Sequence, residues 1–375
     1  MFMLNALTID LEDYFQVHAF SDVIRFEDWG DYESRIERNV DRILEILSEA
    51  GHNSNFKTQN SKLNNSVPSP QPSTKATFFV LGWNAERYSG LVQRIQKEGH
   101  EIACHGYAHK LIYTQSKGEF RQDIRKSKAI LEDITGSEVI GYRAPSYSIT
   151  NKSQWAFEVL LEEGFKYDSS IFPIHHDFYG LPTAPRFPFV ISLNGDNKFE
   201  FSFLNVELNP TQNSTLITHN SQLKTQNSAF KPQSSVLEVN SLTDSLIHLY
   251  SGVSEPQNRS TAAPNSIIEF PISTVKLLGQ NVPVSGGGYF RLLPYPIIRR
   301  ALGSINQKEN KPFIFYAHPW EFDTDQPRIK GVTHLSKFRH YLNLDKTEDR
   351  FRRLLKDFHF SSVRDILKLN NQLTQ

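Results

Sequence analysis

The stretch Glu101-Ile-Ala-Cys-His-Gly-Tyr-Ala-His109 places two histidines four residues apart at the end of a short apolar run. A strand that ends at His105 and opens into a helical turn would put both imidazoles on one side, within reach of one ion. This spacing is typical of metal ligands. The alternative is that two of the 13 histidines in the chain are surface or packing residues.

Polar side chains follow other apolar runs of the chain in the same way. The first run ends in Asp10, Glu12 and Asp13, another leads into Arg143-Ala-Pro-Ser-Tyr147, and a late one into Tyr316-Ala-His318-Pro-Trp320. Barrel enzymes keep their catalytic groups at the carboxyl ends of parallel strands. We therefore expect these groups to meet the two histidines in one site.

The composition excludes several classes of protein. Lys+Arg and Asp+Glu are equal at 41 each, so no overall charge favours nucleic acid or an anionic membrane surface. The single cysteine, Cys104, excludes an internal disulfide and a cysteine-rich zinc module, and it suits a reducing compartment. On a strand its side chain would point away from the His105 face, which favours a buried bystander over a thiolate ligand.

Targeting signals are not evident in the sequence. Residues 1–10 have no basic start and are typical of a first strand rather than a secretory signal. No run approaches the roughly 18 apolar residues of a membrane span. We expect a cytoplasmic protein, free or at the inner face of the membrane.

Strand and helix patterns alternate along most of the chain, which predicts an α/β fold with a parallel sheet that is closed or nearly closed. Strands are predicted at 4–10, 76–81, 101–104, 139–142, 166–170, 267–273 and 312–317. Helices are predicted at 33–50, 85–98, 120–134, 154–163 and 295–302, with Gly51 ending the first, and the segment 346–369 is predicted as helix, strand (358–363) and helix.

Two polar segments interrupt this alternation. Residues 52–75 are predicted to be a disordered insertion, and the block Lys57-Thr-Gln-Asn-Ser61 recurs at 224–228 in the second segment. We expect an N-terminal part of the barrel at 1–190. A largely disordered insertion follows at 191–265, with two strands at its start (199–203) and a helix at 242–250. Residues 266–375 then complete the barrel and add a C-terminal extension.

Five motifs in order resemble the polysaccharide deacetylase family, the carbohydrate esterases that include chitooligosaccharide and peptidoglycan deacetylases. They are Thr8-Ile-Asp-Leu-Glu-Asp13, His105-Gly-Tyr-Ala-His109, Arg143-Ala-Pro-Ser-Tyr147, Tyr167-Asp-Ser-Ser170 and Ala317-His-Pro319. The flanking wording Asp10-Leu-Glu-Asp-Tyr-Phe15, Gly287-Gly-Tyr-Phe-Arg-Leu292 and His318-Pro-Trp-Glu321 is similar to a bacterial branch associated with exopolysaccharide loci that encode a protein-sorting (exosortase) system. The resemblance implies a distorted (β/α)7-type barrel.

The resemblance also implies a metal centre. Its ligands would be His105, His109 and a carboxylate, and Zn²⁺ is the first choice for such donors, with Co²⁺ or Ni²⁺ also accepted. Family members commonly carry the metal-binding acid directly after the catalytic base, where this sequence has Leu11. We favour Glu12 as the third ligand, with Asp13 as the alternative.

The catalytic roles follow from the same resemblance. Asp10 would be the general base and Arg143 the residue that holds it ionised. His318 would be the general acid, with Asp168 orienting its ring, and Tyr147 or its backbone N–H would stabilise the oxyanion. Taken singly, each of these residues has a packing or capping alternative.

The implied activity is metal-dependent N-deacetylation of a polysaccharide or its lipid-linked oligosaccharide precursor in exopolysaccharide biosynthesis, in association with membrane-bound synthesis machinery. Trp320, Tyr289, Phe290, Tyr14 and Phe15 are candidates to stack on sugar rings, or else are core residues. Arg291 is a candidate contact for an acidic sugar or diphosphate. The alternative functions are a catalytically silent carbohydrate-binding protein and an amidohydrolase that acts on a small cyclic amide or N-formyl compound.

Overall fold

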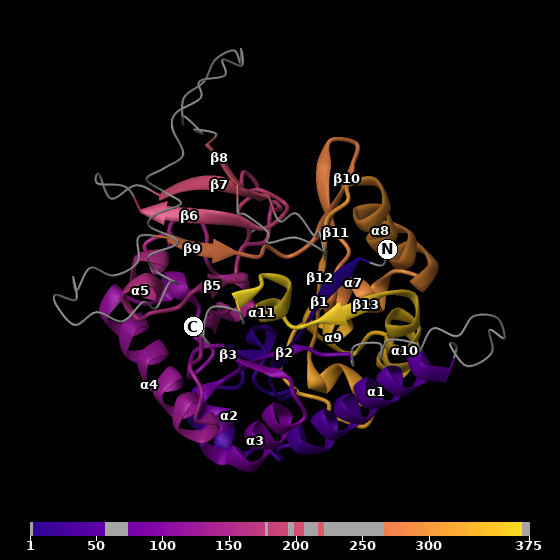
Figure 1. Ribbon diagram of the computed structural model, residues 1–375. Coiled ribbons are helices and arrows are strands. Elements are labelled where there is room, and N and C mark those ends of the chain that lie inside the picture. Colours follow the sequence, from indigo (N-terminus) through magenta and orange to yellow (C-terminus); the bar gives the residue numbers. More distant parts are fainter. Residues whose placement is uncertain are drawn as a thin grey trace.

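A row of parallel strands runs through the centre of the protein (Figure 1). The computed structural model describes residues 3–56, 74–176, 179–193, 199–205, 217–220 and 266–369. Within these ranges, seven strands pair in parallel in the order β12 (Ile314–Ala317), β1 (Leu4–Leu11), β2 (Thr77–Val80), β3 (Glu101–Cys104), β4 (Gly141–Tyr142), β5 (Tyr167–Asp168) and β9 (Ser266–Glu269). The predicted α/β class and its parallel sheet are confirmed.

The row is not closed by a strand ladder between β9 and β12 in the described part of the chain. Loop residues fill this seam instead. Ser273 Oγ accepts a hydrogen bond from the Ile314 backbone N–H at 2.9 Å, and the Ser285 carbonyl accepts one from Tyr316 at 2.9 Å. Gly286 pairs with Tyr316 so closely that a Cβ on the glycine would lie 2.0 Å from the tyrosine carbonyl oxygen. The described strands therefore do not form a closed barrel, and a glycine is required where residue 286 meets β12.

Beyond β9 the sheet continues with antiparallel strands, in the order β6 (Phe189–Leu193), β7 (Phe199–Asn205) and β8 (Ile217–Asn220). A separate hairpin joins β10 (Thr274–Leu277) to β11 (Gln280–Pro283), and β13 (His359–Ser361) pairs in parallel with β1. The segment predicted as two strands at 199–203 is the single strand β7, and the sequence patterns do not predict β6 or the hairpin. The helix predicted at 242–250 lies outside the described residues, as do positions 57–73 of the first polar segment.

Helices lie around the outside of the strand row (Figure 1). They are α1 (Ile36–Phe56), α2 (Gly82–Arg87), α3 (Ser89–Lys97), α4 (Lys117–Thr135), α5 (Ala156–Glu162), α7 (Gly287–Leu292), α8 (Tyr295–Lys308), α9 (His334–Tyr341), α10 (Thr347–Asp357) and α11 (Val363–Ile366). Short 3₁₀ helices are η1 (His18–Phe20), η2 (Phe26–Asp31), η3 (Ile112–Thr114), η4 (Pro145–Tyr147), η5 (Pro319–Phe322) and η6 (Leu344–Lys346). Among the described residues, no helix combines the length and apolar character needed to cross a bilayer.

Two helix predictions need correction. Gly51 does not end the first helix, because α1 continues through it to Phe56. The single helix predicted at 85–98 is two helices, since Tyr88 adopts φ −124° and ψ 47° and separates α2 from α3. By contrast α4 ends at Thr135, close to the predicted bound of 134, and Gly136 follows in the left-handed conformation at φ 62°.

The alternation of side chains along β1 divides an outer core from an inner one. Leu7, Ile9 and Leu11 are fully buried against α1 and the other helices. Ala6 packs on the opposite face with the inner cluster that includes Phe79 of β2. Since strand side chains alternate with a period of two, Thr8 and Asp10 also point inward.

The C-terminal extension closes the amino-terminal end of the strand row. The Val363 backbone N–H donates to Thr77 Oγ1 at 2.8 Å. The buried Glu101 carboxylate accepts hydrogen bonds from Thr77 at 2.6 Å, from the Tyr167 hydroxyl at 2.9 Å and from the Arg364 backbone at 3.0 Å. This end of the barrel is filled, which leaves the carboxyl end for a site.

Cys104 should be chemically inert in the folded protein. Its side chain is 0% exposed and lies in the outer core, and burial raises the pKa of the thiol to about 12. We expect no reaction with a thiol reagent such as dithionitrobenzoate at neutral pH in the native state, and stoichiometric reaction in guanidinium chloride. Rapid labelling of the native protein would contradict the buried position.

Candidate active site and metal centre

The predicted metal-binding and catalytic residues gather at the carboxyl ends of the parallel strands. Asp10 lies in β1 and Glu12 just after it, His105 and His109 follow β3, Arg143 and Tyr147 follow β4, Asp168 ends β5, and His318 follows β12. Since parallel strands all point the same way, these positions share one edge of the sheet. The sequence prediction of a common site at this edge agrees with the structure.

Glu12, His105 and His109 form a compact group of metal-binding side chains. Glu12 Oε1 lies 3.1 Å from Nε2 of both histidines, and one ligand atom from each residue lies within 4.8 Å of the other two. All three side chains are buried. Two imidazoles and one carboxylate suit a divalent ion such as Zn²⁺ and leave coordination positions open.

The loop between the two histidines is not the helical turn that the sequence suggested. His109 adopts a positive φ of 52° and Gly106 one of 74°. Asp123 of α4 accepts a hydrogen bond from the Tyr107 backbone N–H at 2.8 Å, and a Cβ on Gly106 would meet this carboxylate at 2.8 Å. The loop 105–109, fixed by its hydrogen bond to Asp123, therefore brings the two imidazole rings to Glu12, and helical periodicity does not.

His105 is oriented for metal binding by its second ring nitrogen. Nδ1 lies 2.8 Å from the Arg143 carbonyl oxygen, which can only accept a hydrogen bond. Nδ1 must then carry the proton, which leaves the Nε2 lone pair directed at the group. Burial would raise the pKa of Glu12, but His109 and His105 hold it well below its usual range, so the carboxylate is ionised.

Asp13, the alternative ligand, has a different task. Its Oδ2 accepts hydrogen bonds from the Ser34 hydroxyl and the Arg35 backbone N–H, both at 2.8 Å, and its Oδ1 accepts one from the Tyr14 N–H at 2.9 Å. These bonds anchor the chain just before α1. The structure thus favours Glu12 over Asp13.

Asp10 and Arg143 form the buried ion pair that the sequence predicts. Arg143 Nη1 donates to Asp10 Oδ1 at 2.6 Å and to Thr8 Oγ1 at 2.8 Å. The arginine is 0% exposed, and its remaining donors bind Ser169, from Nε to the carbonyl oxygen and from Nη2 to the hydroxyl. Burial lowers the pKa of Arg143, but Asp10 outweighs it and the pKa is raised, so the guanidinium stays charged.

The prediction that Asp168 orients His318 is wrong. Asp168 accepts hydrogen bonds from the Ser170 hydroxyl at 2.6 Å and from the Ser170 backbone at 3.2 Å, and it lies against the buried Glu269. Burial raises the pKa of both carboxyl groups, which favours one shared proton. The functional residue of this motif that sequence reasoning missed is Ser169, which holds Arg143.

His318 faces the base across the centre. Its Nε2 lies 3.9 Å from Asp10 Oδ2 and 4.0 Å from Glu12 Oε1. Its Nδ1 lies 3.6 Å from Glu321 Oε2, an ion-pair distance that is longer than a hydrogen bond. Burial lowers the pKa of His318, but Glu12 and Glu321 raise it to about 9.

Tyr147 brings a hydroxyl group to the centre. Its OH is buried with no hydrogen-bond partner among the described residues, and its ring lies 5.7 Å from the Arg143 guanidinium carbon. Ser146 and Tyr147 both adopt positive φ, at 51° and 54°, which is a strained conformation for these residues. The Tyr147 backbone N–H already donates to the Ala144 carbonyl, so the hydroxyl is the free donor.

Several predicted substrate contacts are instead buried. Tyr14, Phe15, Phe290 and Trp320 are at most 5% exposed, and the Trp320 ring stacks between His318 and His340. None of these four offers a free face for a sugar ring.

Arg291 is likewise 2% exposed and bonded to protein groups, so its predicted contact with an anionic substrate is wrong.

Tyr289 is the predicted contact that does lie near the centre. It is half-buried and shares a side-chain hydrogen bond with Tyr179, whose ring packs 6.4 Å from that of Tyr147. Tyr179 was not singled out by its sequence context, since an isolated tyrosine in an irregular segment carries no pattern.

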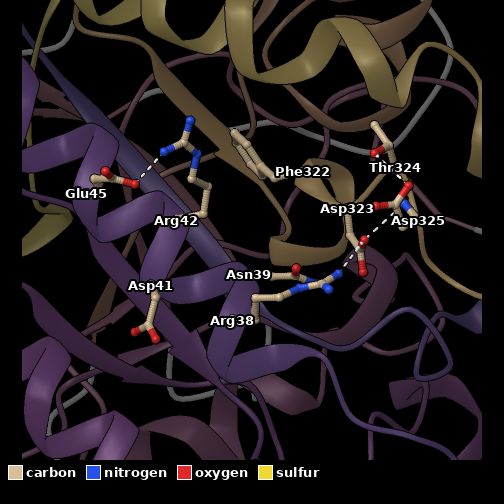
Figure 2. A pocket seen from close by; sticks show the side chains of 9 residues that line it. All are labelled: Arg38, Asn39, Asp41, Arg42, Glu45, Phe322, Asp323, Thr324 and Asp325. Carbon is tan, nitrogen blue, oxygen red and sulfur yellow. Dashed lines mark hydrogen bonds and ion pairs between the residues drawn. The ribbon is translucent and has the colours of Figure 1, made fainter.

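The loop that follows His318 is braced against α1 (Figure 2). Asp323 accepts a hydrogen bond from Arg38 at 2.7 Å and pairs with Arg35 at 3.2 Å. The depression between them is lined by charges that already have partners, such as Arg42 with Glu45. This contact serves to position the loop.

The centre has three parts. Arg143 holds the Asp10 carboxylate, His318 lies opposite it, and Glu12, His105 and His109 form a possible metal-binding set beside them. This arrangement is of the type that metal-dependent hydrolases use. Residues 71–161 match the family model described as polysaccharide deacetylase, and residues 241–368 match one described as a domain of unknown function, DUF3473. The match over residues 71–161 supports the resemblance to the polysaccharide deacetylase family that the five motifs indicate.

Curated relatives are similar over part of the chain. A peptidoglycan deacetylase of Helicobacter pylori is 35% identical over 103 residues, which is 28% of this chain and 33% of the relative. A peptidoglycan-N-acetylglucosamine deacetylase of Bacillus cereus is 39% identical over 89 residues, 24% of this chain and 32% of the relative. A peptidoglycan deacetylase-like protein of Gibberella zeae is 36% identical over 98 residues, 26% of this chain and 28% of the relative. The matches thus span about a third of each relative's length.

Substitution of the two neighbouring acids should separate metal binding from anchoring of α1. Loss of a residue that only hydrogen-bonds a metal ligand typically lowers metal affinity by roughly 10–100-fold. Glu12→Gln should lower the affinity for Zn²⁺ by more than this, because it removes a ligand. Asp13→Asn should lower the melting temperature, at a cost of about 1 kcal/mol for the lost cap, and keep the metal. Competition titration with a metal-binding dye and thermal melting measure the two effects. Loss of metal in Asp13→Asn alone would reverse the assignment.

Proposed function

We propose that the protein is a metal-dependent hydrolase that removes N-acetyl groups from a polysaccharide or its lipid-linked oligosaccharide precursor, in exopolysaccharide biosynthesis. The observation that carries this proposal is the position of Asp10 and His318, 3.9 Å apart beside the Glu12, His105 and His109 group. A base and an acid on either side of a metal centre are what hydrolysis of an amide requires.

The metal would be held by Glu12 Oε1 and by Nε2 of His105 and His109. A divalent cation at this place would polarise the acetyl carbonyl and lower the pKa of a water molecule toward neutrality. Zn²⁺ is the first choice for two nitrogen donors and one oxygen donor. The fixed Nδ1 of His105 and the ionised state of Glu12 support this assignment.

Asp10 would remove a proton from water as it attacks the acetyl carbonyl carbon. The buried Arg143 guanidinium orients this carboxylate, since Nη1 donates to its Oδ1 at 2.6 Å. The second Asp10 oxygen, Oδ2, points toward His318 and is the one available to the water. The base is therefore oriented before substrate arrives.

His318 would donate its Nε2 proton to the departing sugar nitrogen. As the C–N bond breaks, its electron pair stays on that nitrogen, which takes the proton and leaves as an amine, while the acetyl group leaves as acetate. The raised pKa of His318, about 9, keeps the proton available at neutral pH. The unpartnered Tyr147 hydroxyl would donate a hydrogen bond to the oxyanion.

The substrate class rests on the relatives and on the motifs. Two relatives are named as deacetylases of peptidoglycan, an N-acetylated polymer. The presence of both a base and an acid disfavours the catalytically silent alternative. A panel of N-acetylhexosamine oligomers, N-formyl compounds and cyclic amides, assayed by acetate or formate release and by mass change, would separate the remaining possibilities.

Removal of either catalytic group should abolish turnover without unfolding the protein. We expect Asp10→Asn and His318→Ala to lower kcat/KM for an N-acetylhexosamine oligomer by about 10²–10⁴-fold, the usual contribution of general acid–base catalysis. Asp325→Asn changes an exposed carboxylate on the loop after His318 and serves as the matched control. Full turnover by either catalytic variant, measured by acetate release, would refute the assigned roles.

Chelation should remove the activity reversibly. Dialysis against a strong chelator is expected to abolish acetate release, and Zn²⁺ or Co²⁺ should restore it. Mg²⁺ should not, because it prefers a shell of oxygen ligands. Metal content measured by mass spectrometry reports the loading. Undiminished turnover by protein shown to be metal-free would exclude metal dependence.

A further inference from the structure

Two residues of the flanking motifs lie buried together behind His318. Arg291 is 2% exposed and Glu321 1%. Arg291 Nε donates to Glu321 Oε1 at 3.0 Å. Neither residue has a part in the mechanism above, and neither can be reached by a polymer. Burial of the Arg291–Glu321 ion pair costs desolvation energy, which suggests that the pair has a function.

The second oxygen of Glu321 is directed at His318. Oε2 lies 3.6 Å from His318 Nδ1 and accepts a hydrogen bond from the His318 backbone N–H at 3.1 Å. One oxygen of the carboxylate therefore binds the arginine, and the other binds the His318 backbone N–H and lies beside Nδ1, which is buried with no hydrogen-bond partner among the described residues. Catalytic hydrogen bonds are often long in the free enzyme and shorten when substrate is bound.

Arg291 is itself held by the backbone. Its Nη1 donates to the carbonyl oxygens of His340 at 2.7 Å and Leu342 at 3.1 Å. These acceptors are neutral, so Glu321 is the carboxylate with which Arg291 forms an ion pair in the described residues. Burial would raise the pKa of Glu321, but Arg291 and His318 lower it below its usual value.

The face of the His318 ring is restrained as well. Trp320 stacks on it with ring centroids 5.2 Å apart and an interplanar angle of 22°. Trp320 also stacks on His340, with ring centroids 4.1 Å apart and an interplanar angle of 12°. Trp320 therefore packs against one face of the His318 ring and Glu321 lies beside its Nδ1. These contacts leave Nε2 facing Asp10.

We propose that Glu321, anchored by Arg291, is the positioning residue of the general acid: it fixes the proton on His318 Nδ1 and so directs Nε2 at the leaving nitrogen. This proposal rests on the proposed function and gives Glu321 the task that the motif resemblance assigned to Asp168. When Nε2 gives its proton to the nitrogen, the N–H at Nδ1 remains and the neutral ring keeps its orientation. Glu321 neither gains nor loses a proton.

The test uses the zinc-loaded full chain and two kinds of substrate. An N-acetylhexosamine oligomer needs protonation of its leaving amine, whereas an aryl acetate ester releases a phenolate that does not. We expect Glu321→Gln to lower kcat on the amide by about 10–100-fold, part of what a general acid supplies. KM, metal content and aryl ester hydrolysis should change by less than about twofold, and Glu321→Asp should regain part of the amide rate.

Glu101→Gln is the matched control. Glu101 is also a buried carboxylate that pairs with an arginine, Arg364 at 3.3 Å, but it lies at the amino-terminal end of the barrel. Its loss should lower the melting temperature and leave kcat on both substrates unchanged. If Glu321→Gln slows the amide and the ester equally, or slows neither, then Glu321 does not position the acid.

A spectroscopic readout keeps the proposal testable without turnover. In histidine-labelled, zinc-loaded protein, the His318 ring nitrogens are identified by difference from His318→Ala. We expect a protonated Nδ1 in the wild type and a changed Nδ1 signal in Glu321→Gln. If the wild type releases no acetate from any substrate, the proposed function fails, while this signal still decides the role of Glu321. Identical His318 signals in the two proteins would overturn it.

Discussion

The site depends on one fully buried cation, the Arg143 guanidinium. A buried charge without partners would cost several kcal/mol, and Arg143 meets this requirement with Asp10, Thr8 and both polar groups of Ser169. Its own carbonyl oxygen fixes Nδ1 of His105. One residue therefore orients the proposed base through its side chain and a proposed metal ligand through its backbone. The short strands β4 and β5 serve this arrangement, since each ends where its polar groups reach the arginine.

The acid half of the site is built separately from the metal half. His318 follows β12, and the loop after it is fastened to α1 by the Asp323 pairs with Arg35 and Arg38. The same α1 start is tied to the metal half, because Asp13 accepts the Arg35 backbone N–H. The N-terminus of α1 thus joins both halves through two adjacent sets of hydrogen bonds. The distance between Asp10 and His318 is determined by this joint as much as by the pairing of β1 with β12.

The sequence could predict the strand row and the gathering of Asp10, Glu12, His105, His109, Arg143 and His318, because alternation and strand ends place side chains by simple geometry. It could not decide which carboxylate lies behind His318. Asp168 ends β5 and Glu321 follows β12, and only the folded structure shows that Asp168 bonds Ser170 while Glu321 lies beside His318. Arg291 and Trp320 had the residue types of a sugar site but lie buried, since burial depends on neighbours far away in the chain. The helical turn predicted after His105 is absent for a similar reason. Asp123, on the helix that follows, accepts a hydrogen bond from the Tyr107 backbone N–H and holds the loop in a non-helical conformation.

Among the described strands, β1, which carries Asp10, comes first in the chain, but two of its partners lie far away in the sequence. Its neighbour β2 follows soon in the chain, but Thr8 bonds to Phe315 across 307 residues and Asn5 to His359 across 354. A nascent chain that has just released β1 from the ribosome has neither the β12 edge nor the β13 edge to pair with it. Contacts so distant in sequence slow folding, since a long loop must close before they form. Assembly of the proposed base opposite the proposed acid therefore waits for β12, and a chain that stops before this strand lacks the proposed acid.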